Sequence, residues 1–131
     1  MFERNLEKLL ANLNPKLSDE SYIFYVSPSS TFSYFMELNP ICFFREDEGV
    51  TLILEKAIAD KNEISYEMTF KKITLQIHSS LEAVGLTAAV SDALAKNDIS
   101  SNVVAAYYHD HIFVPHDKAE KAIKVLEQLS S

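Results

Sequence analysis

The chain has 131 residues, of which 47% are hydrophobic and 24% charged, as is usual for a globular protein. Its 12 basic and 19 acidic residues give a formal net charge of −7, and the basic residues are scattered, which argues against nucleic acid or a membrane surface as a partner. The two glycines, Gly49 and Gly85, are too few for a P-loop or a dinucleotide-binding motif. A lone cysteine, Cys42, cannot form an internal disulfide, so we expect a cytoplasmic protein.

The first half of the chain predicts one helix and several short strands. Apolar residues at helical spacing predict a helix over 2–13. The aromatic and β-branched run 22–26 predicts a strand, followed by a loop over 27–30, and residues 31–36 are expected to be strand or loop. The runs 41–45 and 50–54 predict a hairpin with Gly49 at a positive φ in its turn. Residues 57–60 predict no more than a helical turn, and 61–66 a connection.

The second half has a clearer pattern. Alternation over 70–77 predicts a strand, and an apolar stripe predicts a helix over 86–97. Two more strands are expected over 99–108 and 112–114, joined through 109–111, and a last helix after Pro115. Asp117 and Glu120 have the spacing of a capping box for that helix, as Ser79 and Glu82 have for the helix before it.

Residues 70–129 therefore have the order β-α-β-β-α, which is the ferredoxin-like βαββαβ order without its final strand. We predict an α+β fold of tandem ferredoxin-like units, with antiparallel sheets and helices on one face. A sheet without its final strand would expose an edge, so we expect a strand of the first half to complete the second sheet.

Three segments of the sequence resemble a known family. They are the strand-to-helix stretch from His78 to Thr87, the run from Ile99 to Val104, and the run from Tyr107 to Pro115. Together they resemble an ACT domain of the small tandem, aspartokinase-like type, and the cellular arginine sensors built from ACT repeats are similar in plan. The segment Phe44 to Leu52 resembles the acidic hairpin in the first repeat of that group. The resemblance implies a degenerate ACT-like half over 1–66 and an ACT domain over 67–131.

The resemblance also implies that the chain is no enzyme, needs no cofactor, and binds a small regulatory ligand, an amino acid, as a homodimer. Such a site commonly lies at the loop between the first strand and the first helix, here about 78–85. The helix N-terminus and the serine hydroxyls suit a carboxylate, and the acidic hairpin suits an ammonium group. The predicted ligand-binding residues are Glu46, Asp47, Gly49, Val50, Thr51, His78, Ser79, Ser80, Leu81, Val84, Gly85, Leu86 and Asn102.

Simpler explanations of the same residues stay open. The serine and glutamate of 79–82 could serve only to cap a helix, and the acidic hairpin could be a solvated turn. A module that assembles through its sheets without any ligand is one alternative function. A metal site at His109 and His111 is another, because residues i and i+2 of a strand point to the same face.

Overall fold

The computed structural model describes residues 4–28 and 31–130. The chain divides into two compact units. We call residues 1–19 and 71–131 the terminal unit, and residues 20–70 the inserted unit. Strand β1 (Pro15–Ser27) begins in the first and ends in the second.

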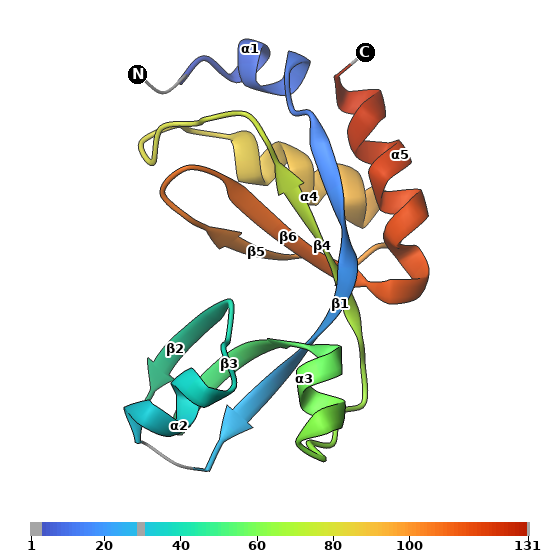
Figure 1. The fold of residues 1–131 in the computed structure, drawn as a ribbon. Coiled ribbons are helices and arrows are strands. Elements are labelled where there is room, and N and C mark those ends of the chain that lie inside the picture. The colour runs from blue at the N-terminus through green and yellow to red at the C-terminus, as the bar shows by residue number, and fades with distance from the viewer. Residues whose placement is uncertain (1–3, 29–30, 131) are drawn as a thin grey trace. The chain divides into compact units, whose positions relative to one another are not determined.

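The terminal unit contains a β-sheet and helices (Figure 1). The sheet has the order β1-β4-β6-β5, where only the first part of β1 belongs to this unit. Its elements are α1 (Leu6–Ala11), β4 (Phe70–Leu75), α4 (Leu86–Lys96), β5 (Asn102–Ala105), β6 (Asp110–Pro115), a 3₁₀ turn (His116–Lys118) and α5 (Ala119–Leu129). The expected helix over 2–13 is confirmed as α1, although residues 1–3 lie outside the described part.

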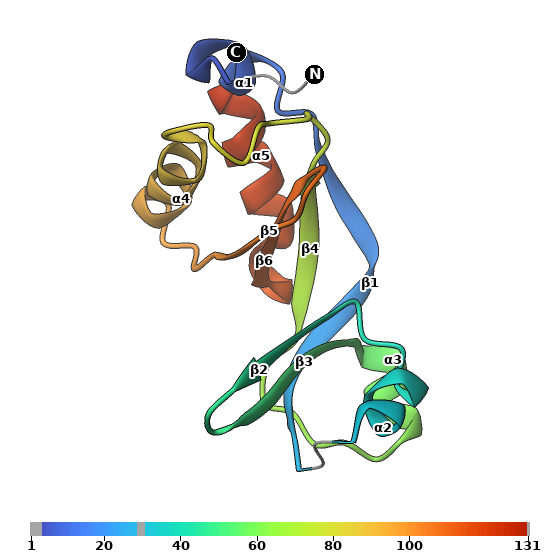
Figure 2. The same ribbon diagram turned by 90° about the vertical axis from the view of Figure 1, so that its left-hand side faces the viewer.

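One apolar core holds this unit together. Figure 2 shows α4 and α5 on the same side of β4 and β6. The helices contribute Val90, Leu94 and Leu126, and the strands contribute Ile73 and Ile112, all of them buried. Alternate residues of β4 therefore pack in one core with the apolar stripe of α4, as the strand and helix periodicities of the sequence predict.

The strand missing from the second half of the chain is supplied by the first half. β1 lies beside β4 in the sheet. The backbone N–H of Lys72 donates to Ser18 Oγ (3.0 Å), and that of Gln76 donates to the carbonyl oxygen of Leu13 (3.1 Å). This confirms the prediction that a first-half strand completes the later sheet. The strand begins at Pro15, well before the predicted 22–26, because pairing with β4 extends it through a polar stretch that has no strand signal of its own.

The inserted unit is a three-stranded antiparallel sheet in the order β2-β3-β1, where only the end of β1 belongs to this unit. Its further elements are α2 (Phe32–Glu37), β2 (Cys42–Glu46), β3 (Gly49–Glu55) and α3 (Lys56–Lys61). The core contains Ile23, Phe35, Leu52, Leu54 and Ala59. Both helices lie on one side of these strands (Figure 2).

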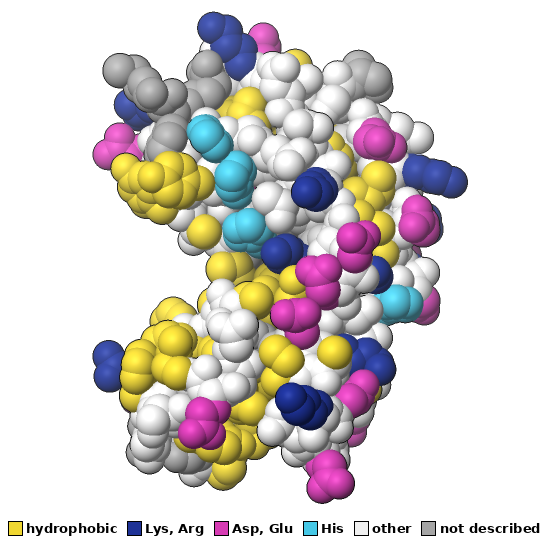
Figure 3. Space-filling view, in the orientation of Figure 1, with side chains coloured by type: hydrophobic (Ala, Val, Ile, Leu, Met, Phe, Trp, Pro, Cys, Tyr) yellow, Lys and Arg dark blue, Asp and Glu magenta, His cyan; other side chains and the backbone are white. Residues whose placement is uncertain are grey.

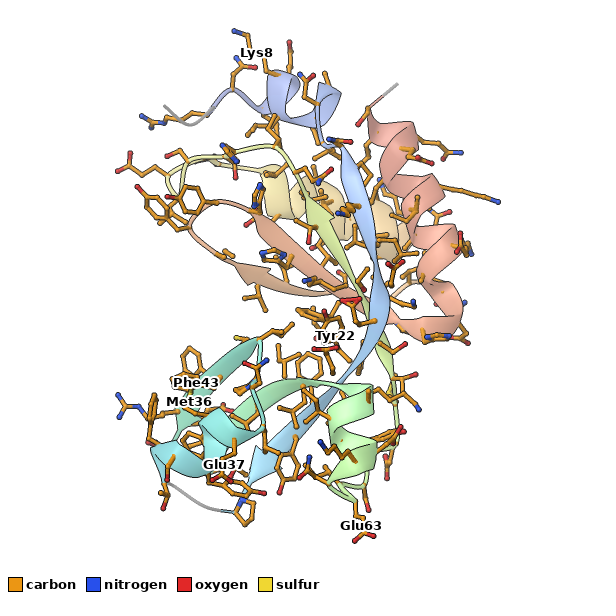
Figure 4. The ribbon with its side chains drawn as sticks, in the orientation of Figure 1. Lys8, Tyr22, Met36, Glu37, Phe43 and Glu63 are labelled. Atoms are coloured by element: carbon orange, nitrogen blue, oxygen red, sulfur yellow. The ribbon has the colours of Figure 1, made fainter. Side chains whose placement is uncertain are left out.

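Helix α2 corrects the sequence prediction for residues 31–36, which were expected to be strand or loop. Thr31 precedes the helix with extended backbone, and Phe35 and Leu38 then point into the core at helical spacing. Phe43 of β2 lies against α2 (Figure 4), with its ring centroid 6.1 Å from that of Phe32 and 6.2 Å from that of Phe35. Phe43 lies outside the helix, so these aromatic contacts favour the helix but cannot be seen in the pattern of its six residues.

The hairpin of the inserted unit is confirmed. Glu46 pairs with Gly49 at its tip, and Gly49 has φ +151°. A Cβ on Gly49 would lie 3.1 Å from Val26 Cγ1, so glycine also suits the position sterically.

Two other sequence predictions are wrong. The hairpin of the terminal unit turns at 106–109, where the N–H of Ala106 donates to the carbonyl oxygen of His109 (3.0 Å), so Asp110 begins β6 rather than occupying the turn. Helix α5 has no capping box. It begins at Ala119 after the 3₁₀ turn, and its N-cap residue, Lys118, makes no side-chain capping bond. Burial of Ala119 and Ala122 fixes this start, and the spacing of Asp117 and Glu120 does not.

Candidate ligand-binding site

The loop over 78–85 connects β4 to α4 in the terminal unit. The predicted capping box at Ser79 is wrong, because α4 begins only at Leu86. Ser80 instead closes a tight turn inside the loop. Its Oγ accepts a hydrogen bond from the N–H of Glu82 (3.1 Å), and its carbonyl oxygen accepts one from the N–H of Ala83 (2.9 Å). The loop therefore has a turn of its own before the helix starts.

Gly85 is the N-cap residue of α4 and adopts φ +97°. That conformation disfavours any residue with a Cβ. An added Cβ would also lie 3.2 Å from Leu6 Cδ2, because α1 packs against this point. The first-turn N–H groups of an α-helix lack intrahelical partners and carry partial positive charge. Gly85 therefore allows the chain to turn sharply into a helix end suited to an anionic group.

The predicted residues of this loop differ in their exposure. Val84 is 83% exposed and Leu81 is 65% exposed, so both offer apolar surface to a ligand or a partner. Leu86 is 4% exposed and belongs to the core, which makes it a structural residue. Glu82 lies 3.8 Å from Arg4 in a solvent-exposed ion pair.

Ser79 is held from the opposite strand by Asp110, a partner that the sequence prediction missed. Asp110 is 8% exposed at the start of β6. Burial raises the pKa of its carboxyl group, while the hydrogen bond with Ser79 and the nearby His109 oppose part of that rise. The Asp110 side chain thus fixes the beginning of the loop. The only sequence signal for this role of Asp110 was its place between two histidines, and that pattern suggested a turn.

Three histidines lie along the same side of the terminal unit. The ring centroids of His78 and His109 are 4.8 Å apart, and those of His109 and His111 are 6.3 Å apart. Figure 3 shows histidine side chains side by side on this face. His111 Nδ1 is 2.9 Å from Thr74 Oγ1, and burial, followed by the charges of Lys72 and His109, lowers the pKa of His111. Within residues 4–28 and 31–130, no group of three or more His, Cys, Asp or Glu side chains is placed to hold one metal ion.

The other predicted ligand residues lie elsewhere. Asn102 is exposed at the start of β5. The rest are in the hairpin of the inserted unit, where Thr51 Oγ1 donates to Glu46 Oε1 (2.6 Å), Asp47 is exposed and Val50 is 7% exposed. The predicted residues therefore form separate groups, each within one unit.

The terminal unit also has two hollows. One, of about 560 Å³, is lined by Ala11, Asn12, Asn14, Pro15, Gln76, Ile77, Glu127 and Ser130. The other, of about 490 Å³, is lined by Ala95, Asp98, Ile99, Ser100, Pro115, Asp117 and Lys118. Neither contains a predicted ligand-binding residue.

Each of the two units has helices on one face of antiparallel strands. The fold is therefore α+β, of the tandem ferredoxin-like class. Family models identify the protein family, because ACT domain models match residues 3–71 and 68–128. The chain belongs to the ACT domain family, as the sequence resemblance indicated. The domain type is one that generally serves regulation by small ligands and often dimerises.

Solved structures agree with this assignment. A protein of unknown function from Vibrio cholerae, described as a possible transport protein, is 44% identical, with a TM-score of 0.87 and 96% of each chain covered. The ligand-free regulatory subunit of aspartate kinase from Thermus thermophilus is 10% identical, with a TM-score of 0.66, over 90% of this chain and 97% of that one. Aspartate kinase from Clostridium acetobutylicum is 12% identical, with a TM-score of 0.69, over 92% of this chain but 36% of that one. The search of curated proteins found no match to this chain.

Proposed function

We propose that this chain is a regulatory protein that binds an amino acid at the loop over 78–85. The observation that carries the proposal is the geometry at Gly85, where the loop enters α4 at φ +97°. Family membership supports small-ligand binding, because ACT domains generally bind small molecules such as amino acids. The role is regulatory rather than catalytic.

The chemistry of the loop suits a carboxylate. Helix α4 has 11 residues, long enough for its peptide dipoles to place partial positive charge at the first turn. Ser79 and Ser80 add hydroxyl groups next to that turn, and Asp110 holds Ser79 in place. The exposed side chains of Leu81 and Val84 supply apolar surface for the ligand's side chain.

The acidic hairpin is proposed as a second ligand-contacting segment. Glu46 and Asp47 are exposed, and Thr51 orients Glu46 through a 2.6 Å hydrogen bond. A carboxylate held in this way suits an ammonium group. Because the hairpin belongs to the inserted unit, its role is tested by a variant of its own, Glu46→Gln.

We also propose that the protein is a cytoplasmic homodimer. Among the described strands, β2 and β5 have a neighbour on one side only, and such edges pair readily with another chain. Among the described helices, none has the length and apolar character to cross a membrane. The mass in solution, measured by light scattering during size-exclusion chromatography, tests the dimer: about 30 kDa supports it, and the chain mass of 14.8 kDa contradicts it.

Calorimetric titration of a loop variant with amino acids tests the binding site. Val84→Glu adds a negative charge beside the helix N-terminus at a position that is 83% exposed, so it should leave the fold intact and repel a carboxylate. The matched control is Met68→Glu, which introduces the same charged side chain at an apolar position 53% exposed in the inserted unit. We expect the Val84 variant to lose affinity at least about tenfold, which corresponds to about 1.4 kcal/mol. Equal affinity in the two variants would place the ligand elsewhere.

A further inference from the structure

We propose that His78 and His109 form a transition-metal half-site on the terminal unit, selective for Ni²⁺, Cu²⁺ or Zn²⁺, with water in the remaining coordination positions. The site is separate from the sequence-based suggestion of His109 with His111. It also does not depend on the amino acid binding proposed for the adjacent loop.

The distance between the two rings suits a shared ion. Two imidazoles that bind one ion through nitrogens ~2.0–2.1 Å away, at a roughly tetrahedral angle, have ring centroids about 5 Å apart. The centroids of His78 and His109 are 4.8 Å apart. Their ring planes meet at 58°, so the rings are not stacked face to face. Each imidazole has two nitrogens, so a hydrogen bond at one leaves the other available to a metal.

The backbone on both sides of the pair is already fixed. Ser79 follows His78, Asp110 follows His109, and these two following residues are joined by a side-chain hydrogen bond. The bond joins the beginning of the loop over 78–85 to the start of β6, next to both imidazoles. Preorganised ligands of this kind lower the ordering cost of metal binding.

The neighbouring side chains define which ligands are available. His111 lies farther away, with its ring centroid 6.3 Å from that of His109 and its Nδ1 2.9 Å from Thr74 Oγ1. The Asp110 carboxylate is engaged with Ser79. The two imidazoles are nitrogen ligands, which suit Ni²⁺, Cu²⁺ and Zn²⁺ and disfavour Mg²⁺ and Ca²⁺.

Calorimetric titration of the purified full chain with Ni²⁺ tests the half-site. We expect one Ni²⁺ per chain, and His78→Asn and His109→Asn should each lower the affinity at least about tenfold. The matched control is His116→Asn, an exposed histidine in the 3₁₀ turn, which should bind as the wild type does. Circular dichroism of each variant confirms that it is folded.

A second measurement keeps the test valid if one variant folds poorly. Substoichiometric Ni²⁺ should broaden the imidazole proton resonances of His78 and His109 in the wild-type protein more than those of His116. No binding by the wild type at millimolar Ni²⁺, equal affinity in all three variants, or broadening centred on His116 would each overturn the proposal.

Discussion

Replacing Gly85 by alanine tests how the loop over 78–85 is built. At φ +97°, a residue with a Cβ costs about 1–2 kcal/mol in backbone strain. The new Cβ would lie 3.2 Å from Leu6 Cδ2, which must move by a few tenths of an ångström. Against this, alanine lowers the entropy of the unfolded chain and so contributes about 0.4–1 kcal/mol of stability. We expect a net loss of about 1–1.5 kcal/mol in the free energy of unfolding.

Urea denaturation followed by far-ultraviolet circular dichroism measures this loss. Two further variants separate its causes. In a Leu6→Ala background the steric part disappears, so the alanine substitution should cost a few tenths of a kcal/mol less but remain unfavourable. Asparagine tolerates positive φ better than alanine, so Gly85→Asn should be the milder change. A Gly85→Ala protein whose free energy of unfolding is within about 0.3 kcal/mol of the wild type would refute the proposed role of φ. So would a Gly85→Asn protein that is less stable than the Gly85→Ala protein.

Two other predictions concern the core and a tyrosine pair. Leu126→Ala should cost about 2–5 kcal/mol in urea denaturation, because Leu126 is 0% exposed in the terminal core, whereas the exposed neighbour Glu127→Ala should change little. In the inserted unit, the hydrogen bond with Tyr34 (3.5 Å between the hydroxyl oxygens), followed by burial, raises the pKa of Tyr25 to about 12. Its contribution to stability should therefore be complete below pH 10 and be lost as the pH rises toward 12. Absorbance titration of Tyr34→Phe should find the pKa of Tyr25 lowered toward 10, and an unchanged value would contradict the pairing.

Much of the fold follows from local pattern. The alternation of β4, the apolar stripe of α4 and the glycine of the β2–β3 hairpin are each visible within a few residues, and each prediction from them is confirmed. The errors share a different cause. Residues 15–21 become strand through pairing with β4, and 32–37 become helix through packing with Phe43, so both depend on residues outside the segment itself. The turn at 106–109 follows from the pairing of β5 with β6, in which Ala105 lies opposite Asp110.

The candidate binding loop over 78–85 likewise has features that the sequence reveals and others that only the fold reveals. Gly85 could be singled out from the sequence, because a glycine before a helical stripe suggests an unusual backbone. The Ser79–Asp110 bond and the closeness of His78 to His109 join segments about 30 residues apart, so only the folded sheet reveals them. The capping-box spacing at 79–82 misplaced the helix start because a serine can close a turn as readily as it caps a helix.

Thermal unfolding of the purified chain against each of the twenty amino acids tests the central claim most directly. An amino acid present at about 100 times its dissociation constant adds about 2.7 kcal/mol to the free energy of unfolding, which raises the melting temperature by several degrees. We predict such a shift with one or a few amino acids, abolished by Val84→Glu and retained by Met68→Glu. No shift with any of the twenty, in the presence or absence of Ni²⁺, would contradict the proposal that this ACT protein binds an amino acid.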